Sequence, residues 1–264
     1  MDWQLKLSRA LRVATEAARY AGAHLMHEFS RVGPEDAVEK GPGDFVTKTD
    51  RESERLIKQR IRMDFPDDVI LSEEAGGPVP DSEFLWLVDP LDGTTNFIHR
   101  FPFFCVSIAF TANRRPEVGV IYDPLHDDIF TCKRDEGVWL NGSPILVSSC
   151  ADPARAYVAT GFPSRFREEA DGYARGFRNV LTSVSGLRRG GSAALDLAYV
   201  ACGRFDGFWE PRLASWDMAA GALLVETAGG VVSDESGKAW NFSSRGIIAG
   251  NPAIHPFLVR LLTA

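Results

Sequence analysis

The chain has 264 residues, of which 45% are hydrophobic and 25% are charged, and its formal net charge is -7 at pH 7. This composition is typical of a globular protein with a buried core, and the length suits one large domain. The acidic balance argues against a surface that coats nucleic acid, and no apolar stretch approaches the ~18 residues of a membrane-spanning helix.

The first half of the chain predicts two helices that are followed by strands. Apolar residues at helical spacing predict a helix over residues 3–30, and Asp50 is expected to be the N-cap of a second helix over 51–64. Short apolar runs predict strands at 69–71 and 84–88. An antiparallel meander and a hairpin are expected to follow, at residues 103–112, 116–123, 127–133 and 136–142.

The second half alternates between strands and helices from about residue 151 onward. Strands are expected at residues 155–160, 205–209, 231–233 and 246–249. Helices are expected at residues 168–182, 192–202, 217–227 and 253–262. Because no long linker interrupts the chain, we expect a single domain over 1–264, with an α+β half over about 1–150 and an α/β half over about 151–264.

Two features bear on the cellular compartment. Residues 1–6 lack the basic segment and the apolar core of a signal peptide. None of the four cysteines belongs to a Cys-x-x-Cys pair, and Cys105 and Cys202 lie in apolar runs, as free thiols of a reducing compartment do. We therefore expect a cytoplasmic protein that binds neither membranes nor, directly, nucleic acid.

The chemistry is expected to centre on the stretch Phe84–Phe97, which reads Phe-Leu-Trp-Leu-Val-Asp-Pro-Leu-Asp-Gly-Thr-Thr-Asn-Phe. Its apolar start predicts a buried strand that ends at Asp89 and Asp92. Carboxylates at the exit of a buried strand are costly unless positive charge meets them, and Mg²⁺ prefers such oxygen ligands. Gly93 permits a tight turn, and the residues after it can begin a helix whose free N–H groups suit a phosphate.

Two other interpretations of this stretch remain open at this point. Asp-Pro-x-Asp-Gly is also an ordinary turn signal. Phosphatases that form an aspartyl-phosphate carry a strand followed by Asp-x-Asp-Gly-Thr. Here two residues separate Asp89 from Asp92 and one of them is Pro90, which argues against the covalent mechanism.

Three more acidic residues stand at predicted junctions between elements. Asp50 and Asp217 each precede or open a predicted helix, where an acidic residue often serves only as a cap. Glu73 follows the strand at 69–71, and glutamates in loops are usually solvated. If the strands that end near Glu73 and Asp89 are neighbours, the acidic residues converge on one site.

Four motifs in this order resemble the inositol monophosphatase family. They are Gly43–Asp50, Glu73–Glu74, Asp89–Asn96 and Trp216–Gly230, so the resemblance runs through most of the chain. It implies an α+β fold, the layered αβαβα sandwich of the inositol monophosphatase and fructose-1,6-bisphosphatase type. It also implies Mg²⁺-dependent hydrolysis of a phosphate monoester and a homodimer.

The resemblance further implies a set of metal ligands. Glu73, Asp89 and the Leu91 carbonyl are expected to hold one Mg²⁺. Asp89, Asp92 and Asp217 are expected to hold a second ion, and Glu73 reaches a weaker third. Two to three ions per site are therefore expected.

The remaining roles implied by the resemblance concern water, phosphate and alcohol. Thr94, hydrogen-bonded to Asp50, is expected to orient the attacking water, with Glu73 as a further catalytic residue. N–H groups at Gly93 and Thr94 are expected to hold the phosphate. The polyol hydroxyls are expected to meet Asp92, Ser192, Ala193, Glu210 and Asp217.

The predicted alcohol-binding side differs in detail from that of the animal enzymes. Ser192 stands where those enzymes often have threonine. The stretch before Asp44 is one residue shorter, so no role is transferred to Lys40. Glu210 follows the predicted strand at 205–209, where an exposed turn glutamate is the alternative.

The substrate expected from these observations is inositol 1-phosphate. Another sugar phosphate, including fructose 1,6-bisphosphate, or histidinol phosphate is an alternative within the same chemistry. A different class of function is also open, because some bacterial members of the family resemble this chain and act as protein partners of the transcription machinery.

Overall fold

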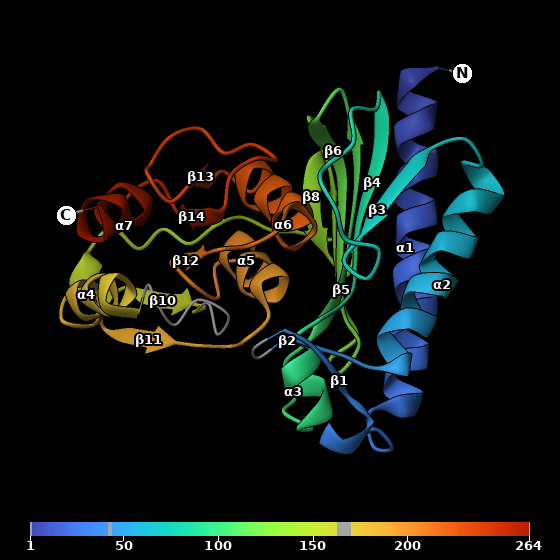
Figure 1. Cartoon of the computed structure of the whole chain (residues 1–264). Helices are drawn as coiled ribbons and strands as arrows, with labels where there is room; N and C mark the ends of the chain where they lie inside the picture. The colour runs from blue at the N-terminus through green and yellow to red at the C-terminus, as the bar shows by residue number, and fades with distance from the viewer. Residues whose placement is uncertain (1, 42–43, 163–169, 264) are drawn as a thin grey trace.

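The computed structural model describes residues 2–41, 44–162 and 170–263. Figure 1 shows five layers, which confirm the predicted αβαβα order. A small sheet and a large sheet alternate with three pairs of helices, α4 (Ala170–Leu181) with α7 (Ile254–Leu262), α5 (Ala193–Ala201) with α6 (Ser215–Thr227), and α1 (Trp3–Glu28) with α2 (Lys48–Asp64). Three apolar cores fill the spaces between these layers.

The large sheet has seven strands and contains the predicted meander. Its first two strands are parallel and the others pair antiparallel, so the strands that end near Glu73 and Asp89 are neighbours, which meets the condition for their acidic residues to converge. In spatial order the strands are β3 (Val69–Ser72), β4 (Phe84–Asp92), β5 (Cys105–Ala112), β6 (Arg115–Asp123), β7 (Asp128–Lys133), β8 (Gly137–Leu140) and β9 (Ser143–Pro144).

The small sheet has five strands of mixed direction, all from the second half of the chain. In spatial order they are β11 (Gly186–Arg188), β10 (Tyr157–Thr160), β12 (Gly207–Pro211), β14 (Gly246–Gly250) and β13 (Val231–Ser233). The strand predicted at 205–209 therefore lies two residues later. As a consequence Glu210 belongs to β12 itself, whereas the sequence placed it after a strand end.

The segment between the first two predicted helices, residues 31–50, contains short regular elements. It holds the short helix η1 (Pro34–Asp36) and the antiparallel pair β1 (Val38–Gly41) and β2 (Asp44–Val46). Two other short elements are α3 (Thr94–Ile98), which starts where the sequence predicted, and η2 (Pro153–Arg155). The first two residues of the helix predicted at 168–182 lie outside the described residues.

The prediction that Asp50 caps the second helix is wrong. The N-cap is Thr47, whose hydroxyl oxygen accepts a hydrogen bond from the Thr49 N–H at 3.0 Å. Asp50 lies three residues later and accepts a hydrogen bond from the Thr47 N–H at 2.8 Å. Both groups of a capping box are therefore present, and the helix starts one turn earlier than the acidic signal suggested.

Small residues let the helices lie close to the sheets and to each other. A Cβ at Gly22 of α1 would lie 2.4 Å from the Tyr122 ring on β6, and one at Gly221 of α6 would lie 2.5 Å from Leu197 on α5. Because α5 and α6 are covered on both sides by sheets, their sequences are apolar around almost the whole helix. None of the helices in the described ranges combines the length and apolar content that crossing a bilayer requires.

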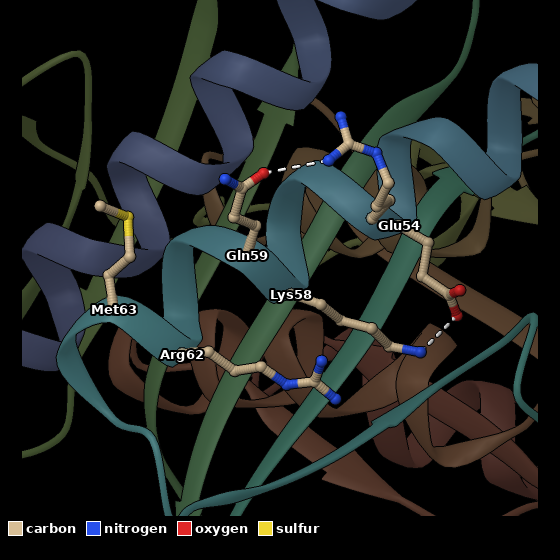
Figure 2. A pocket seen from close by; sticks show the side chains of 6 residues that line it. Glu54, Lys58, Gln59, Arg62 and Met63 are labelled. Atoms are coloured by element: carbon tan, nitrogen blue, oxygen red, sulfur yellow. Dashed lines mark hydrogen bonds and ion pairs between the residues drawn. The ribbon is translucent and has the colours of Figure 1, made fainter.

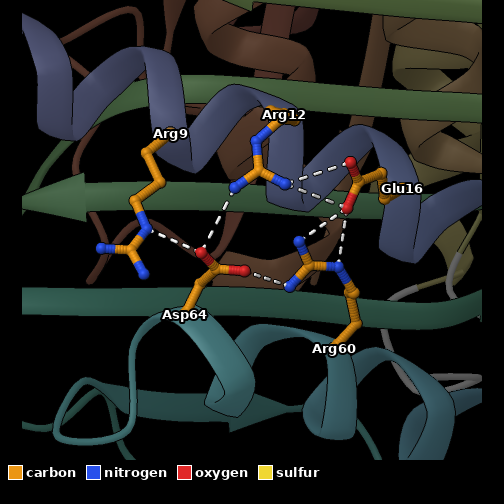
Figure 3. A network of polar contacts seen from close by, with 5 residues as sticks. All are labelled: Arg9, Arg12, Glu16, Arg60 and Asp64. Atoms are coloured by element: carbon orange, nitrogen blue, oxygen red, sulfur yellow. Dashed lines mark hydrogen bonds and ion pairs between the residues drawn. The ribbon is translucent and has the colours of Figure 1, made fainter.

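Helices α1 and α2 are joined at their surface by a network of ion pairs (Figure 3). The Asp64 carboxylate lies 2.7 Å from Arg9 Nε and 3.2 Å from a terminal nitrogen of Arg12. Arg60 lies between Asp64 and Glu16 and bonds to both. Burial opposes the ionised form of Asp64, but the hydrogen bonds from Arg60 and Arg9 outweigh it and lower its pKa to about 2.

Replacing Asp64 with asparagine is expected to lower the free energy of unfolding by about 1–2 kcal/mol at pH 7, after allowance for solvent screening. Because the folded-state pKa lies below the unfolded value of ~3.9, the stabilisation is complete above pH ~4 and disappears as the pH falls through about 2. Urea unfolding of both proteins between pH 7 and 2.5 tests this expectation. Asp67→Asn, at an exposed neighbouring acid, is the control, and a difference that persists unchanged at pH 2.5 contradicts the ion-pair explanation.

Candidate functional site

The site begins where β4 ends. The pairing of β4 with β5 shifts in register between Asp89 and Asp92, which turns the chain out of the sheet. Asp89 is buried, and one of its carboxylate oxygens accepts a hydrogen bond from the Leu91 N–H at 3.0 Å. Gly93 follows with a left-handed φ of 101°, which glycine adopts without strain, and α3 starts at the next residue.

The start of α2 meets the start of α3 through one hydrogen bond. Thr94 Oγ1 lies 2.8 Å from Asp50 Oδ1 and 3.1 Å from the Leu91 carbonyl oxygen. The other oxygen of Asp50 accepts hydrogen bonds from the backbone N–H and the hydroxyl of Thr47. Burial raises the pKa of Asp50, and these hydrogen bonds reduce the rise. The predicted contact between Thr94 and Asp50 is therefore present.

The two halves of the chain meet at Asp92. Its Oδ2 accepts hydrogen bonds of 2.7 Å from the Ser192 hydroxyl and 2.7 Å from the Ala194 N–H, at the start of α5. Burial raises the pKa of Asp92 to about 6, and the two hydrogen bonds and the nearby Arg189 limit the rise. Thus a carboxylate at the end of a strand of the large sheet is held by a helix of the middle layer.

Four carboxylates lie close enough to influence one another. Burial raises the pKa of Asp89 well above its usual range, and the charges of Glu73, Asp92 and Asp217 raise it further. Burial and the charges of Glu73 and Asp92 do the same to Asp217. Asp217 lies in the first turn of α6 and accepts a hydrogen bond from the Ala214 N–H at 2.7 Å. It therefore caps the helix and also faces the other acids.

Glu210 approaches the same acids from β12. Its side chain fills the space beside Gly161, where a Cβ would lie within 1.8 Å of the carboxylate. Burial, and after it the charge of Asp92, raise the pKa of Glu210 to about 8, while Arg189 opposes the rise. Glu210 is thus a half-buried acid at the edge of the cluster rather than a solvated turn residue.

Comparison with known proteins shows the family to which the chain belongs. The model described as the inositol monophosphatase family matches residues 6–264. The chain belongs to this family. It is 44% identical over 245 residues to Nus factor SuhB of Salmonella typhimurium, with 92% of each chain covered. It is 41% identical over 254 residues to the inositol-1-monophosphatase of Mesorhizobium japonicum, with 96% of each chain covered.

A solved structure of similar sequence has the same fold as this family member. The extragenic suppressor protein suhB of Bartonella henselae matches with a TM-score of 0.91 at 42% identity, over 96% of this chain and 98% of that chain. The predicted fold class, the layered sandwich of the inositol monophosphatase type, is therefore confirmed.

Several residues of the site were not predicted from the sequence. The N–H that holds Asp92 comes from Ala194, which the sequence did not single out, whereas Ala193, an expected contact of the polyol hydroxyls, packs in the apolar core. Arg189 is the cation that offsets the charges of Asp92 and Glu210, and its guanidinium lies 4.6 Å from the centre of the Phe162 ring. The one feature of the sequence that could have indicated Arg189 is its position directly before two glycines. The side chain of Lys40 lies outside the described residues.

The acid cluster fits a hard divalent cation in its chemistry. All the side chains that raise one another's pKa offer oxygen ligands, and an ion between them would remove the repulsion that the pKa shifts record. Within the described ranges, no three His, Cys, Asp or Glu side chains already form a compact ligand set. The hydrogen bonds that hold Asp92 and Asp217 turn one oxygen of each toward the protein, which leaves the other oxygen as the candidate ligand.

Proposed function

We propose that this chain hydrolyses small phosphate monoesters with the help of Mg²⁺, and that inositol 1-phosphate is among its substrates. The observation that supports the proposal is the convergence of Glu73, Asp89, Asp92 and Asp217 beside the pair formed by Asp50 and Thr94. The relative from Mesorhizobium japonicum bears the name of this activity.

In this proposal the carboxylates hold the cations. Glu73, Asp89 and the Leu91 carbonyl would hold one ion, Asp89, Asp92 and Asp217 a second, and Glu73 would reach a third. When bound, Mg²⁺ lowers the pKa of water and stabilises the attacking and leaving oxygens of an in-line displacement. The hydrogen bonds to Asp92 and Asp217 fix these two carboxylates before substrate arrives, so less ordering is needed on binding.

Thr94 and Asp50 are proposed to prepare the attacking water. The Thr94 hydroxyl lies between Asp50 and the Leu91 carbonyl, so its position is fixed on two sides. Asp50, oriented by Thr47, accepts the hydrogen bond of the Thr94 hydroxyl. The Thr94 oxygen is then free to accept a proton from the attacking water. Backbone N–H groups at Gly93 and Thr94 would hold the phosphate oxygens.

The alcohol is proposed to lie against the second half of the chain. The expected contacts of its hydroxyls are Ser192, Ala193, Glu210, Asp92 and Asp217. Among these, Glu210 is the main candidate for binding a ring hydroxyl, because it reaches the acid cluster from the small sheet. The substrate would therefore lie between the end of β4 and the end of β12.

A phosphate-release assay tests the proposal directly. The panel comprises inositol 1-phosphate, fructose 1,6-bisphosphate, histidinol phosphate and adenosine 3′,5′-bisphosphate, each with and without Mg²⁺. We expect Mg²⁺-dependent release that is fastest with inositol 1-phosphate. If phosphate is released from none of these substrates at saturating Mg²⁺, the enzymatic function is refuted. If another compound of the panel is strongly preferred, that compound takes the place of inositol 1-phosphate as the proposed substrate.

Glu210→Gln is expected to raise KM for inositol 1-phosphate about ten- to hundredfold at pH 9, with a smaller change in kcat. An ionised carboxylate is a stronger acceptor for a ring hydroxyl than an amide. Because the pKa of Glu210 is raised to about 8, it is ionised at pH 9 and increasingly protonated below that value, so the ratio of the two KM values should fall toward pH 6.5. Steady-state kinetics across this pH range measure the effect.

Two controls separate alcohol binding from support of the fold. Glycerol 2-phosphate lacks the ring and should be affected much less by Glu210→Gln. Glu226→Gln changes an exposed glutamate of α6 that does not line the cavity beside Glu210, and it should leave both substrates unaffected. An equal loss on the ring substrate and the small substrate means that Glu210 supports the acid cluster, and its assignment to the alcohol then fails.

The reaction is expected to proceed without a covalent phosphoenzyme. Asp89 is buried and holds the Leu91 N–H, and two residues separate it from Asp92, so neither acid has the arrangement of an aspartyl nucleophile. Hydrolysis of a substrate with chiral phosphorus in ¹⁸O-water should invert the configuration. Retention would demonstrate an intermediate and contradict direct attack by water.

A second function is supported by the names of relatives. We propose that the chain also binds the transcription machinery, because a relative with 44% identity is named Nus factor SuhB, and these names favour this role over inositol 1-phosphate turnover as the principal one. Binding to a purified elongation complex that contains RNA polymerase and Nus proteins tests the role. We expect Asp92→Asn to bind as tightly as the wild type, since a protein-binding function does not need hydrolysis. Absence of binding by the wild type would refute this role.

A further inference from the structure

One face of α2 is rich in cations on a protein that is acidic as a whole. Lys48, Arg51, Arg55, Lys58 and Arg62 recur at intervals of three or four residues and therefore lie along one side of the helix. We refer to these five residues as the basic stripe. All but Lys58 are exposed, and the stripe runs for about 20 Å along the helix axis. The whole chain, in contrast, has a net charge of -7.

The basic stripe is not needed to hold α2 in place. Ile57 and Ile61 pack the opposite face of the helix into the core, and Arg60 with Asp64 forms the ion pairs to α1. Within the described residues, Lys48, Arg51 and Arg62 make no ion pair. The other two cations pair only with carboxylates of the same helix, at 2.6 Å for Arg55 and 3.0 Å for Lys58. The exposed pair of Arg55 with Glu52 contributes little to stability and is easily exchanged, whereas the pair of Lys58 with Glu54 is partly buried, with side chains 20% and 15% exposed.

A groove accompanies the stripe, and it combines charge with an apolar surface. Figure 2 shows Lys58 and Arg62 extending from the same side of α2, with Met63 at its end. The groove is lined by Glu54, Arg55, Lys58, Gln59, Arg62 and Met63. Met63 is 75% exposed. A methionine side chain adapts its shape to different apolar partners, and one with three quarters of its surface exposed contributes little to the core.

We infer that this face docks an acidic, amphipathic segment of a partner protein. Carboxylates of the segment would meet Arg51, Arg55 and Arg62, and an apolar side chain would cover Met63. The stripe has the length of about four helical turns, so a short helix with acidic residues at matching intervals can engage it from end to end. The inference rests on the proposed role as a partner of the transcription machinery and places that contact on α2.

Nucleic acid fits this face less well than an acidic protein segment. The groove contains no aromatic side chain on which a base could stack. A long polyanion would also extend beyond the stripe onto a protein of net charge -7, where it meets repulsion. A short acidic segment ends where the stripe ends and avoids this cost.

Charge reversal tests the inference. The variant Arg51→Glu/Arg55→Glu/Arg62→Glu is compared with Arg175→Glu/Arg178→Glu/Arg260→Glu, which makes the same change in net charge on exposed residues of α4 and α7. Binding to the elongation complex of RNA polymerase and Nus proteins is measured for both variants and the wild type. We expect the stripe variant to bind at least about tenfold more weakly, through slower association, and the control to bind normally. Phosphate release by all three proteins should be equal, which verifies that they are folded.

A zero-length carbodiimide cross-link identifies the contacting segment. This reagent joins lysine amines to carboxylates, and Lys48 and Lys58 place two amines on the stripe. We expect cross-linked peptides that join one of them to an acidic stretch of a polymerase subunit or Nus protein. Cross-links that involve only Lys6, Lys133 or Lys238, which lie outside the stripe, would overturn the assignment of the contact to α2.

The outcomes separate this inference from the function on which it rests. If the wild type does not bind the complex, the partner role itself fails and the inference falls with it. If the wild type and the stripe variant bind equally, the partner role stands and the inference is wrong. If the difference between them disappears when the same proteins are assembled without nucleic acid, the stripe binds RNA or DNA. If charge reversal changes the size of the free protein in light scattering, the face joins copies of this chain.

Discussion

Asp92→Asn is expected to lower kcat for phosphate release about 10³-fold or more at saturating Mg²⁺. The substitution keeps the hydrogen-bond acceptor for Ser192 and Ala194, because the amide oxygen can take the place of Oδ2. It removes the negative charge that the proposed second cation requires. The loss should therefore appear in turnover while the contact between the two halves of the chain persists.

The same substitution is expected to leave the melting temperature unchanged or to raise it when Mg²⁺ is absent. Removing one charge from a group of acids that raise one another's pKa relieves repulsion in the folded protein. Asp68→Asn, at an acid that contacts the Trp86 indole N–H at 3.1 Å outside the site, is the control and should remain active. Near-wild-type turnover of Asp92→Asn would refute the metal assignment.

Thr94→Val is expected to reduce kcat by about 10²- to 10⁴-fold with a smaller change in KM. The substitution removes the hydroxyl that joins Asp50 to the proposed position of the water, while the side chain keeps its shape. Asp50 retains both hydrogen bonds from Thr47, so we expect a loss of unfolding free energy of only about 1–2 kcal/mol. Assays well below the melting temperature, with urea unfolding of the same preparation, separate the two effects.

The adjacent threonine provides a matched control. Thr95 is exposed and makes no side-chain contact with Asp50 in the described structure, so Thr95→Val should retain most of the activity. Equal losses at both positions would indicate that α3 is disturbed as a whole. An unchanged kcat for Thr94→Val would show that water is activated without this hydroxyl, and the role of Asp50 would then fail as well.

The acidic residues of the site could be predicted because each stands at the end of a strand or the start of a helix. Glu73 follows β3 and Asp89 follows the apolar run of β4, so the pairing of these two strands was the one condition needed to bring the two acids together. Arg189 could not be found in this way, because it belongs to no motif and its effect on Asp92 depends on the distance between the ends of two strands, β4 and β11, that belong to different sheets. Arrangements that arise only from tertiary packing leave little trace in a local pattern.

Prediction from the local sequence also failed where two nearby residues could each cap the same helix. We expected Asp50 to be the N-cap of the second helix, but threonine also suits this position. The structure uses Thr47 as the cap, which frees one oxygen of Asp50 for Thr94. Similarly, the strand predicted at 205–209 lies two residues later because its apolar run does not show where pairing with β10 and β14 begins. Register of this kind is set by the partners of a strand.

The bond between Asp92 and the start of α5 has a consequence for protein synthesis. A chain that emerges from the ribosome presents Asp89 and Asp92 long before Ser192, Ala194 and Asp217 are made. Until then Asp92 lacks the groups that hold it, and a proposed ligand of the second cation is missing. A prematurely terminated product therefore carries the motif from Asp89 to Asn96 but no complete site, and the proposed release of phosphate would report that nearly the whole chain has been translated and folded.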